Sequence, residues 1–133
     1  MEKTIQIDGD PIAFKSTGLT LRLYKSQFNR DFFQDILKLV PVMKKMEGVE
    51  DITIDNADVL SDIDFDIFRR MVWVLAKTAD RSTPDLDSWL DGFDYDPTLE
   101  ILPDLMDLML HSLGNMSKKK TIPATKSKGQ RNR

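Results

Sequence analysis

Alternating apolar and polar positions near the start of the chain predict a β-hairpin. Within residues 4–15 the apolar members of the alternation are Ile5, Ile7, Ile12 and Phe14. Between the two halves lies Asp8-Gly9-Asp10-Pro11, a run of turn-forming residues. A period of two around such a turn is typical of paired antiparallel strands. An isolated hairpin is only marginally stable, so the rest of the chain must pack against it.

Beyond the hairpin the apolar period lengthens to that of helices. A first helix is expected after Ser16 and Thr17, whose hydroxyls can cap it, and it should end near Asn29. A second helix, at 31–39, should be stopped by Pro41. Its inward side is predicted to hold Phe32, Phe33, Ile36, Leu37 and Val40. Residues 42–58 are expected to form a connector, with a short helix at 41–46.

A third helix, at about 61–78, contains the uninterrupted apolar run Met71-Val72-Trp73-Val74-Leu75-Ala76. A helix that is apolar all round must be covered on most sides, so this one is predicted to be the core helix. A short fourth helix should begin with Thr83 as its N-cap and Pro84 at its first position, and end before Gly92.

The last helix, expected from Pro97 to Leu113 with a break or kink at Pro103, has an unusually wide apolar side. At roughly 100° per residue, its apolar side chains span an arc of about 200°. A helix packed on one core needs a stripe only somewhat wider than about 100°. Either this helix is enclosed between two others, or part of the arc receives a partner's helix or a second copy of the chain. On the second explanation, the predicted partner-binding residues are Ile101, Leu105, Leu108 and Leu110.

Charge divides the 133-residue chain into two regions. All 22 acidic residues precede residue 115, whereas residues 115–133 contain seven lysines and arginines and no acid. Because the whole chain has a formal net charge of −3, the part before the tail carries −10. We therefore expect a mainly α-helical acidic domain with an N-terminal hairpin at 1–114, followed by a flexible, disordered basic tail at 115–133.

The residues that enzymes and metal sites use are scarce. The chain has no cysteine, one histidine, His111, and six scattered glycines that form no phosphate-binding loop. Asp62, Asp64 and Asp66 have the spacing of calcium ligands, but Ile67 and Trp73 stand where a calcium loop has glycine and glutamate. We therefore expect acids that favour a helix N-terminus, and a protein that is not an enzyme and has no cofactor and no metal.

Three stretches of the sequence resemble the tail-assembly chaperones of long-tailed (siphovirus-type) phages and prophages of Gram-positive bacteria. They are Ile5-Gln6-Ile7-Asp8-Gly9 with Phe14-Lys15, Leu21-Arg22-Leu23-Tyr24 through Phe28-Asn29-Arg30-Asp31-Phe32, and Trp73-Val74-Leu75-Ala76-Lys77-Thr78-Ala79-Asp80, continued by Trp89-Leu90-Asp91 and Phe93. The resemblance covers about residues 4–120. The chain departs from the pattern at Asn29, where glycine is common, and at Arg81, where proline is frequent.

The resemblance implies a binding function. Members of this family bind the tape-measure protein, a long and aggregation-prone chain, and keep it soluble while the tail tube assembles around it. Many are also made in a longer form by ribosomal frameshifting, through which they can contact the tail tube protein, and Lys118-Lys119-Lys120 marks the expected frameshift region. The family resemblance also implies the cytoplasm of the bacterial host as the location and absence from the mature virion.

Three further expectations concern partners. Surplus apolar surface is compatible with a homo-oligomer. No stretch approaches the roughly 20 apolar residues of a membrane span, and the N-terminal sequence lacks the apolar core of a secretion signal. The alternative function is a phage or host regulatory adaptor whose basic tail binds nucleic acid. Nucleic acid is the less favoured partner, because the tail has no aromatic residue to stack on bases and the acidic body repels a duplex.

Overall fold

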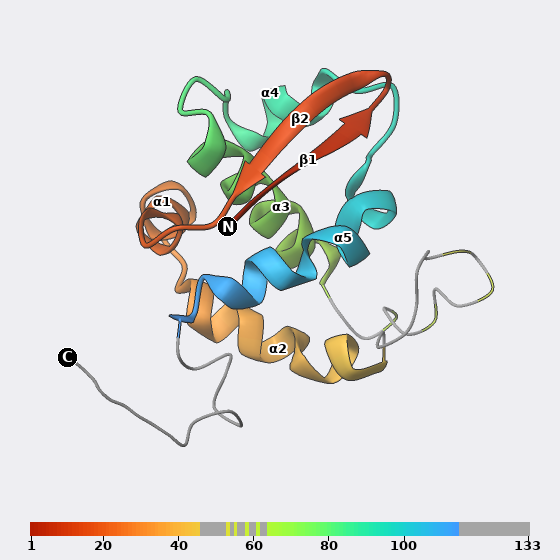
Figure 1. Cartoon of the computed structure of the whole chain (residues 1–133). Helices are drawn as coiled ribbons and strands as arrows, with labels where there is room; N and C mark the ends of the chain where they lie inside the picture. The colour runs from red at the N-terminus through yellow and green to blue at the C-terminus, as the bar shows by residue number, and fades with distance from the viewer. Residues whose placement is uncertain (46–52, 54, 56–57, 59–60, 62–63, 115–133) are drawn as a thin grey trace.

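The computed structural model describes residues 1–45, 53, 55, 58, 61 and 64–114 and shows a hairpin packed on helices (Figure 1). In chain order the elements are β1 (Glu2–Ile7), β2 (Asp10–Lys15), α1 (Leu19–Phe28), α2 (Phe32–Lys45), α3 (Phe65–Ala79), α4 (Leu86–Asp91) and α5 (Thr98–His111). The predicted mainly α-helical fold with an N-terminal hairpin is confirmed. Most of the predicted connector and the whole basic tail lie outside the described residues.

The hairpin is closed by a two-residue turn in the left-handed region. Asp8 and Gly9 have φ angles of 55° and 84°, and Ile7 lies opposite Asp10. Such a turn suits the right-handed twist of the strands, and both residue types tolerate positive φ. Ile7 and Phe14 are buried on the inner face of the hairpin, which packs against α3. The predicted hairpin is therefore confirmed, and it begins two residues earlier than expected.

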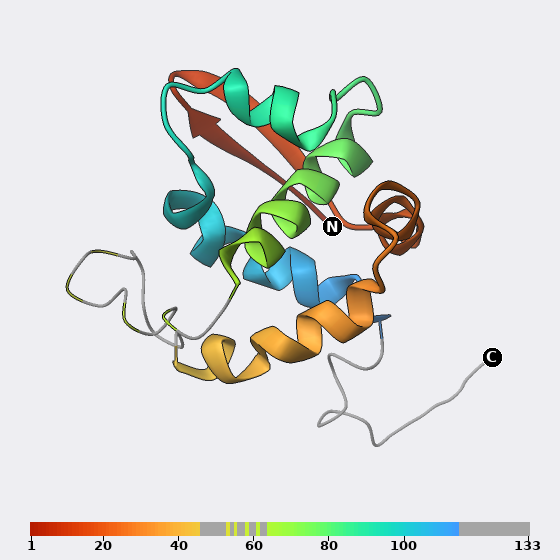
Figure 2. The same ribbon diagram turned by 180° about the vertical axis from the view of Figure 1, so that it is seen from behind.

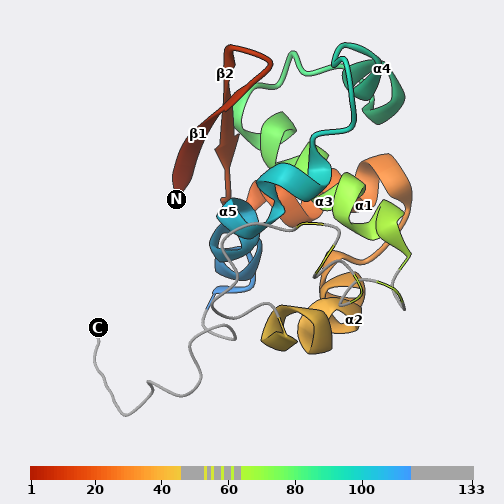
Figure 3. The ribbon, with the colours of Figure 1, turned by 90° about the vertical axis from the view of Figure 1, so that its right-hand side faces the viewer.

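Helix α3 is the centre of the molecule. All six residues of the run Met71–Ala76 are buried, with at most 2% of any of them exposed. The helix contacts β2, α1, α4 and α5, which surround it in the views of Figures 2 and 3. It begins at Phe65 rather than at 61, because the carboxylate of Asp64 accepts the backbone N–H of Asp66 (3.0 Å) and caps it.

Both internal prolines were predicted to disturb a helix. The predicted stop at Pro41 is wrong, and so is a break of the helix at Pro103. Helix α2 continues through Pro41 to Lys45, and α5 continues through Pro103. Pro41 and the residue one turn earlier, Leu37, both lie on the exposed side, where water can bind the carbonyl that lost its N–H donor. Val42, the next residue, is buried in the core, and its burial stabilises the continuation of α2 as a helix. Tertiary packing thus outweighs the local penalty of proline.

The start of α4 also differs from the prediction. Its N-cap is Asp85, whose carboxylate accepts the N–H of Ser88 (3.2 Å), rather than Thr83. The Thr83 hydroxyl instead donates to the carbonyl oxygen of Asp80 (2.7 Å), in the loop that follows α3. Because Thr83 is committed to that loop, the helix begins two residues later.

A buried carboxylate joins the first three helices. The Asp35 side chain of α2 is 3% exposed and accepts hydrogen bonds from the Tyr24 hydroxyl (2.6 Å) and from Arg30 (2.6 and 2.8 Å). Arg70 of α3 lies 3.7 Å from the same carboxylate. Burial alone would raise the pKa of Asp35, but the hydrogen bonds from Arg30 and Tyr24 and the charge of Arg70 outweigh it and lower the pKa. The charged form is therefore the stable one in the fold.

Replacing Asp35 by asparagine should destabilise the protein by about 1.5 to 3 kcal/mol, because it removes the charge from the buried group that accepts hydrogen bonds from Arg30 and Tyr24. The pKa of Asp35 is lower in the folded state than its unfolded value of about 4. The carboxylate therefore contributes its full stabilisation to the wild-type protein above about pH 5, and this contribution is lost as the pH falls toward the folded pKa. Urea denaturation between pH 3 and pH 7 measures the destabilisation by the substitution and the pH dependence of stability. The loss of stability on acidification should be smaller in the variant than in the wild type. The matched control is Asp66→Asn, which removes a 60% exposed partner of Arg69 and should cost less than about 1 kcal/mol. Equal losses in the two variants would contradict the structural role of Asp35.

Candidate functional site

The structure places most of the predicted partner-binding residues in the core. Ile101, Leu105 and Leu108 of α5 are between 0% and 2% exposed, and only Leu110 is partly exposed. Helix α5 contacts α3 on one side and β1 on another, so it needs apolar residues over a wide arc to satisfy both neighbours. The wide arc therefore reflects an enclosed helix, and these three residues offer no surface to a partner. The predicted frameshift region, Lys118–Lys120, lies outside the described residues.

Apolar surface is instead exposed on α2. Leu37 is 51% exposed, the largest exposed fraction of any leucine described by the structure, although it was predicted to face inward. Together with the partly exposed Phe33 and Val40 and the exposed Pro41 it forms what we name the α2 outer stripe. At roughly 100° per residue these four side chains fall within an arc of about 100°. The buried side of the same helix is made by Phe32, Asp35, Ile36, Leu39 and Val42.

Cations border the α2 outer stripe. Lys38, Lys44 and Lys45 are exposed on the same helix, and the Lys38 side chain is 58% exposed. Such an apolar strip beside charged side chains can serve as a protein-binding surface. Figures 1 and 3 place α2 at the end of the molecule opposite the hairpin turn and α4. The stripe is thus well separated from the second surface feature.

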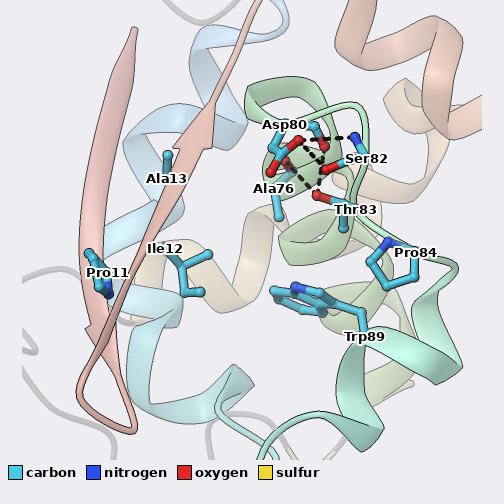
Figure 4. A pocket seen from close by; sticks show the side chains of 9 residues that line it. All are labelled: Pro11, Ile12, Ala13, Ala76, Asp80, Ser82, Thr83, Pro84 and Trp89. Carbon is cyan, nitrogen blue, oxygen red and sulfur yellow. Dashed lines mark hydrogen bonds between the residues drawn. The ribbon is translucent and has the colours of Figure 1, made fainter.

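That second feature is a groove beside β2, shown in Figure 4. Its volume is about 370 Å³, and we name it the β2 groove. It is lined by Pro11, Ile12 and Ala13 of β2, Ala76 of α3, Asp80, Ser82, Thr83 and Pro84 of the following loop, and Trp89 of α4. Its walls therefore combine an apolar floor with a polar rim.

The loop wall of the β2 groove is held in place by hydrogen bonds. The Lys77 ammonium donates to the carbonyl oxygens of Arg81 (2.8 Å) and Thr83 (2.6 Å). The indole N–H of Trp73 donates to the carbonyl oxygen of Pro84 (2.7 Å). A groove with such a fixed wall loses little conformational entropy when it binds a ligand.

The groove also has a charged rim. The Asp80 carboxylate accepts hydrogen bonds from the Ser82 hydroxyl (2.6 Å) and from the Ser82 N–H (3.0 Å). These bonds lower the pKa of Asp80, so the carboxylate is ionised at neutral pH. No pattern in the sequence predicts this groove, because its walls come from two segments far apart in the chain, residues 11–13 and residues 76–89.

The single histidine joins two elements. The Nδ1 atom of His111 lies 3.2 Å from the hydroxyl of Ser16, which lies 2.7 Å from the hydroxyl of Ser112. Ser16 is 1% exposed, so its oxygen is not accessible to a substrate. The contact fixes the end of β2 to the end of α5. In the described part of the chain no three His, Asp or Glu residues are grouped to hold a metal ion.

Leu105→Ala should lower the free energy of unfolding by about 2 to 5 kcal/mol, because it opens a cavity beside α3. Leu110→Ala is the matched control on the same helix and should cost less than about 1.5 kcal/mol, since that side chain is already partly exposed. Urea denaturation of both variants measures the difference. A small and equal loss of stability at both positions would contradict the burial of Leu105 and would make it a candidate surface residue again.

Comparisons with known proteins identify no relative of this chain. Among the helices that the structure describes, none combines the length and apolar character required to cross a bilayer. No protein-family model, curated protein or solved structure matches the sequence or the fold.

Proposed function

We propose that this protein is a tail-assembly chaperone of a long-tailed phage or prophage, which binds the tape-measure protein and keeps it soluble during assembly of the tail tube. The proposal combines the resemblance of residues 4–120 to that family with one structural observation, the α2 outer stripe. It is a binding function and uses no catalytic residue.

The α2 outer stripe supports binding of a helix. Its side chains follow the i, i+4, i+7 and i+8 positions of α2, the spacing at which one helix packs along another. The tape-measure proteins that the family binds are largely helical. The exposed lysines beside the stripe favour a partner helix whose apolar side is flanked by acidic residues.

The net charge suits the same role. Residues 1–114 carry −10, and a protein of high net charge keeps a complex with an apolar partner in solution through mutual repulsion. The α2 outer stripe supplies the contact, and the acidic remainder of the domain supplies the solubility.

Co-expression with the tape-measure protein of the same phage or prophage tests the proposal. The wild-type chain should move the tape-measure protein into the soluble fraction and purify with it. Leu37→Asp should weaken the binding at least about tenfold, because it places a charge in the middle of the apolar contact.

The matched control is Leu19→Asp, which changes a 38% exposed leucine at the start of α1, where an acid suits the helix dipole. This variant should bind as the wild type does. Equal binding of the tape-measure protein by the Leu37 and Leu19 variants would show that the contact does not involve α2. A tape-measure protein that stays insoluble beside the folded wild-type chain would contradict the proposed function itself.

A further inference from the structure

The free edge of β2 faces the β2 groove. Met1 and Ser16 exchange two main-chain hydrogen bonds (2.9 and 3.4 Å), which makes them a hydrogen-bonded pair of the hairpin. Such pairs alternate along antiparallel strands, so the ladder continues at every second residue of β2. The residues between them, Pro11, Ala13 and Lys15, direct their main-chain groups away from β1.

In the part of the chain that the structure describes, no strand lies beside these outward groups. Among the described residues no backbone group bonds to the N–H of Ala13, and the groove begins directly next to it. An unpaired strand edge is a template for another extended segment. Because Pro11 has no N–H, pairing along this edge is confined to a short stretch around Ala13.

The groove walls specify the side chains of that segment. Ile12, Ala76 and Trp89 form an apolar surface that suits an aliphatic side chain (Figure 4). Asp80 lies at the rim, and further carboxylates surround this end of the molecule. These are Asp8 and Asp10 at the hairpin turn and Asp85 and Asp87 on α4. The complementary ligand is an extended segment with an aliphatic residue next to several cations.

A second copy of β2 does not meet this requirement. Its sequence, Asp10-Pro11-Ile12-Ala13-Phe14-Lys15, begins with an acid and contains a single cation. It therefore lacks the several cations that would complement the carboxylates at this end of the molecule.

We propose that the β2 groove binds the basic segment of this same chain that begins at Lys118. The sequence there is Lys118-Lys119-Lys120-Thr121-Ile122-Pro123. Three cations precede the β-branched pair Thr121 and Ile122, which favour an extended strand, and Ile122 supplies the aliphatic side chain. No acid follows residue 114, so the whole segment is complementary in charge to the carboxylates at this end of the molecule.

The start of the segment lies within reach of the groove. Ser112 touches Ser16 just beyond the end of β2. Ile12 is four residues further along the strand, about 13 Å away at the usual rise. The eight residues that follow Gly114, ending at Ile122, span at most about 29 Å when extended. Ile122 can therefore reach the apolar floor in the same molecule, and its binding covers the strand edge that would otherwise recruit other chains.

Amide hydrogen exchange of Ala13, measured by NMR on the full chain, tests the inference. The Ala13 N–H should exchange at least about tenfold more slowly in the wild type than in a chain carrying Lys118→Gln, Lys119→Gln, Lys120→Gln and Ile122→Asp, because the main-chain bond is lost in the variant. Arg131→Gln with Arg133→Gln is the control, and it should leave the wild-type rate unchanged.

Two outcomes would overturn the inference. One is an equal exchange rate of Ala13 in the wild type and in the quadruple variant. The other is a protection that rises with protein concentration, which would assign the segment to another copy of the chain. Since no tape-measure protein is present in this measurement, its outcome is independent of the proposed chaperone function.

Discussion

The burial of α3 on all its sides is the constraint on which the rest of the structure depends. A helix with six successive buried residues has no side to turn toward water, so neighbouring elements must cover each of them. The hairpin covers one side, α1 and α5 cover others, and α4 packs near its C-terminal end. The wide apolar arc of α5 follows from the same requirement, because α5 packs on both the central helix and the hairpin.

The parts of the fold that depend on local pattern could be predicted from the sequence. The hairpin follows from alternation around Asp8-Gly9, and the central helix follows from the run Met71–Ala76. Helix ends were less predictable, since Pro41 is tolerated through the burial of Val42 and Thr83 is engaged by the preceding loop. Such contacts join residues whose proximity a local pattern does not encode.

The candidate surfaces could not be predicted from the sequence for a related reason. Apolar core and apolar interface residues have the same chemistry, so the sequence alone could not separate the enclosed Leu105 from the exposed Leu37. The β2 groove is formed jointly by the edge of β2, by the loop that follows α3, and by α4, so a local sequence pattern does not predict it. The two surfaces lie at opposite ends of the molecule and differ in charge, with lysines around the α2 outer stripe and carboxylates around the groove. They are therefore suited to different ligands, a helix at one end and a basic extended segment at the other.

Most apolar residues of α5 are buried inside the molecule, and α2 carries the surface that we propose for a partner. Hydrogen-exchange mass spectrometry of the protein with and without bound tape-measure protein tests this most directly. Binding should slow exchange in peptides covering residues 32–45 and leave exchange in peptides covering residues 98–111 unchanged. Protection confined to residues 98–111, with no change in α2, would contradict it.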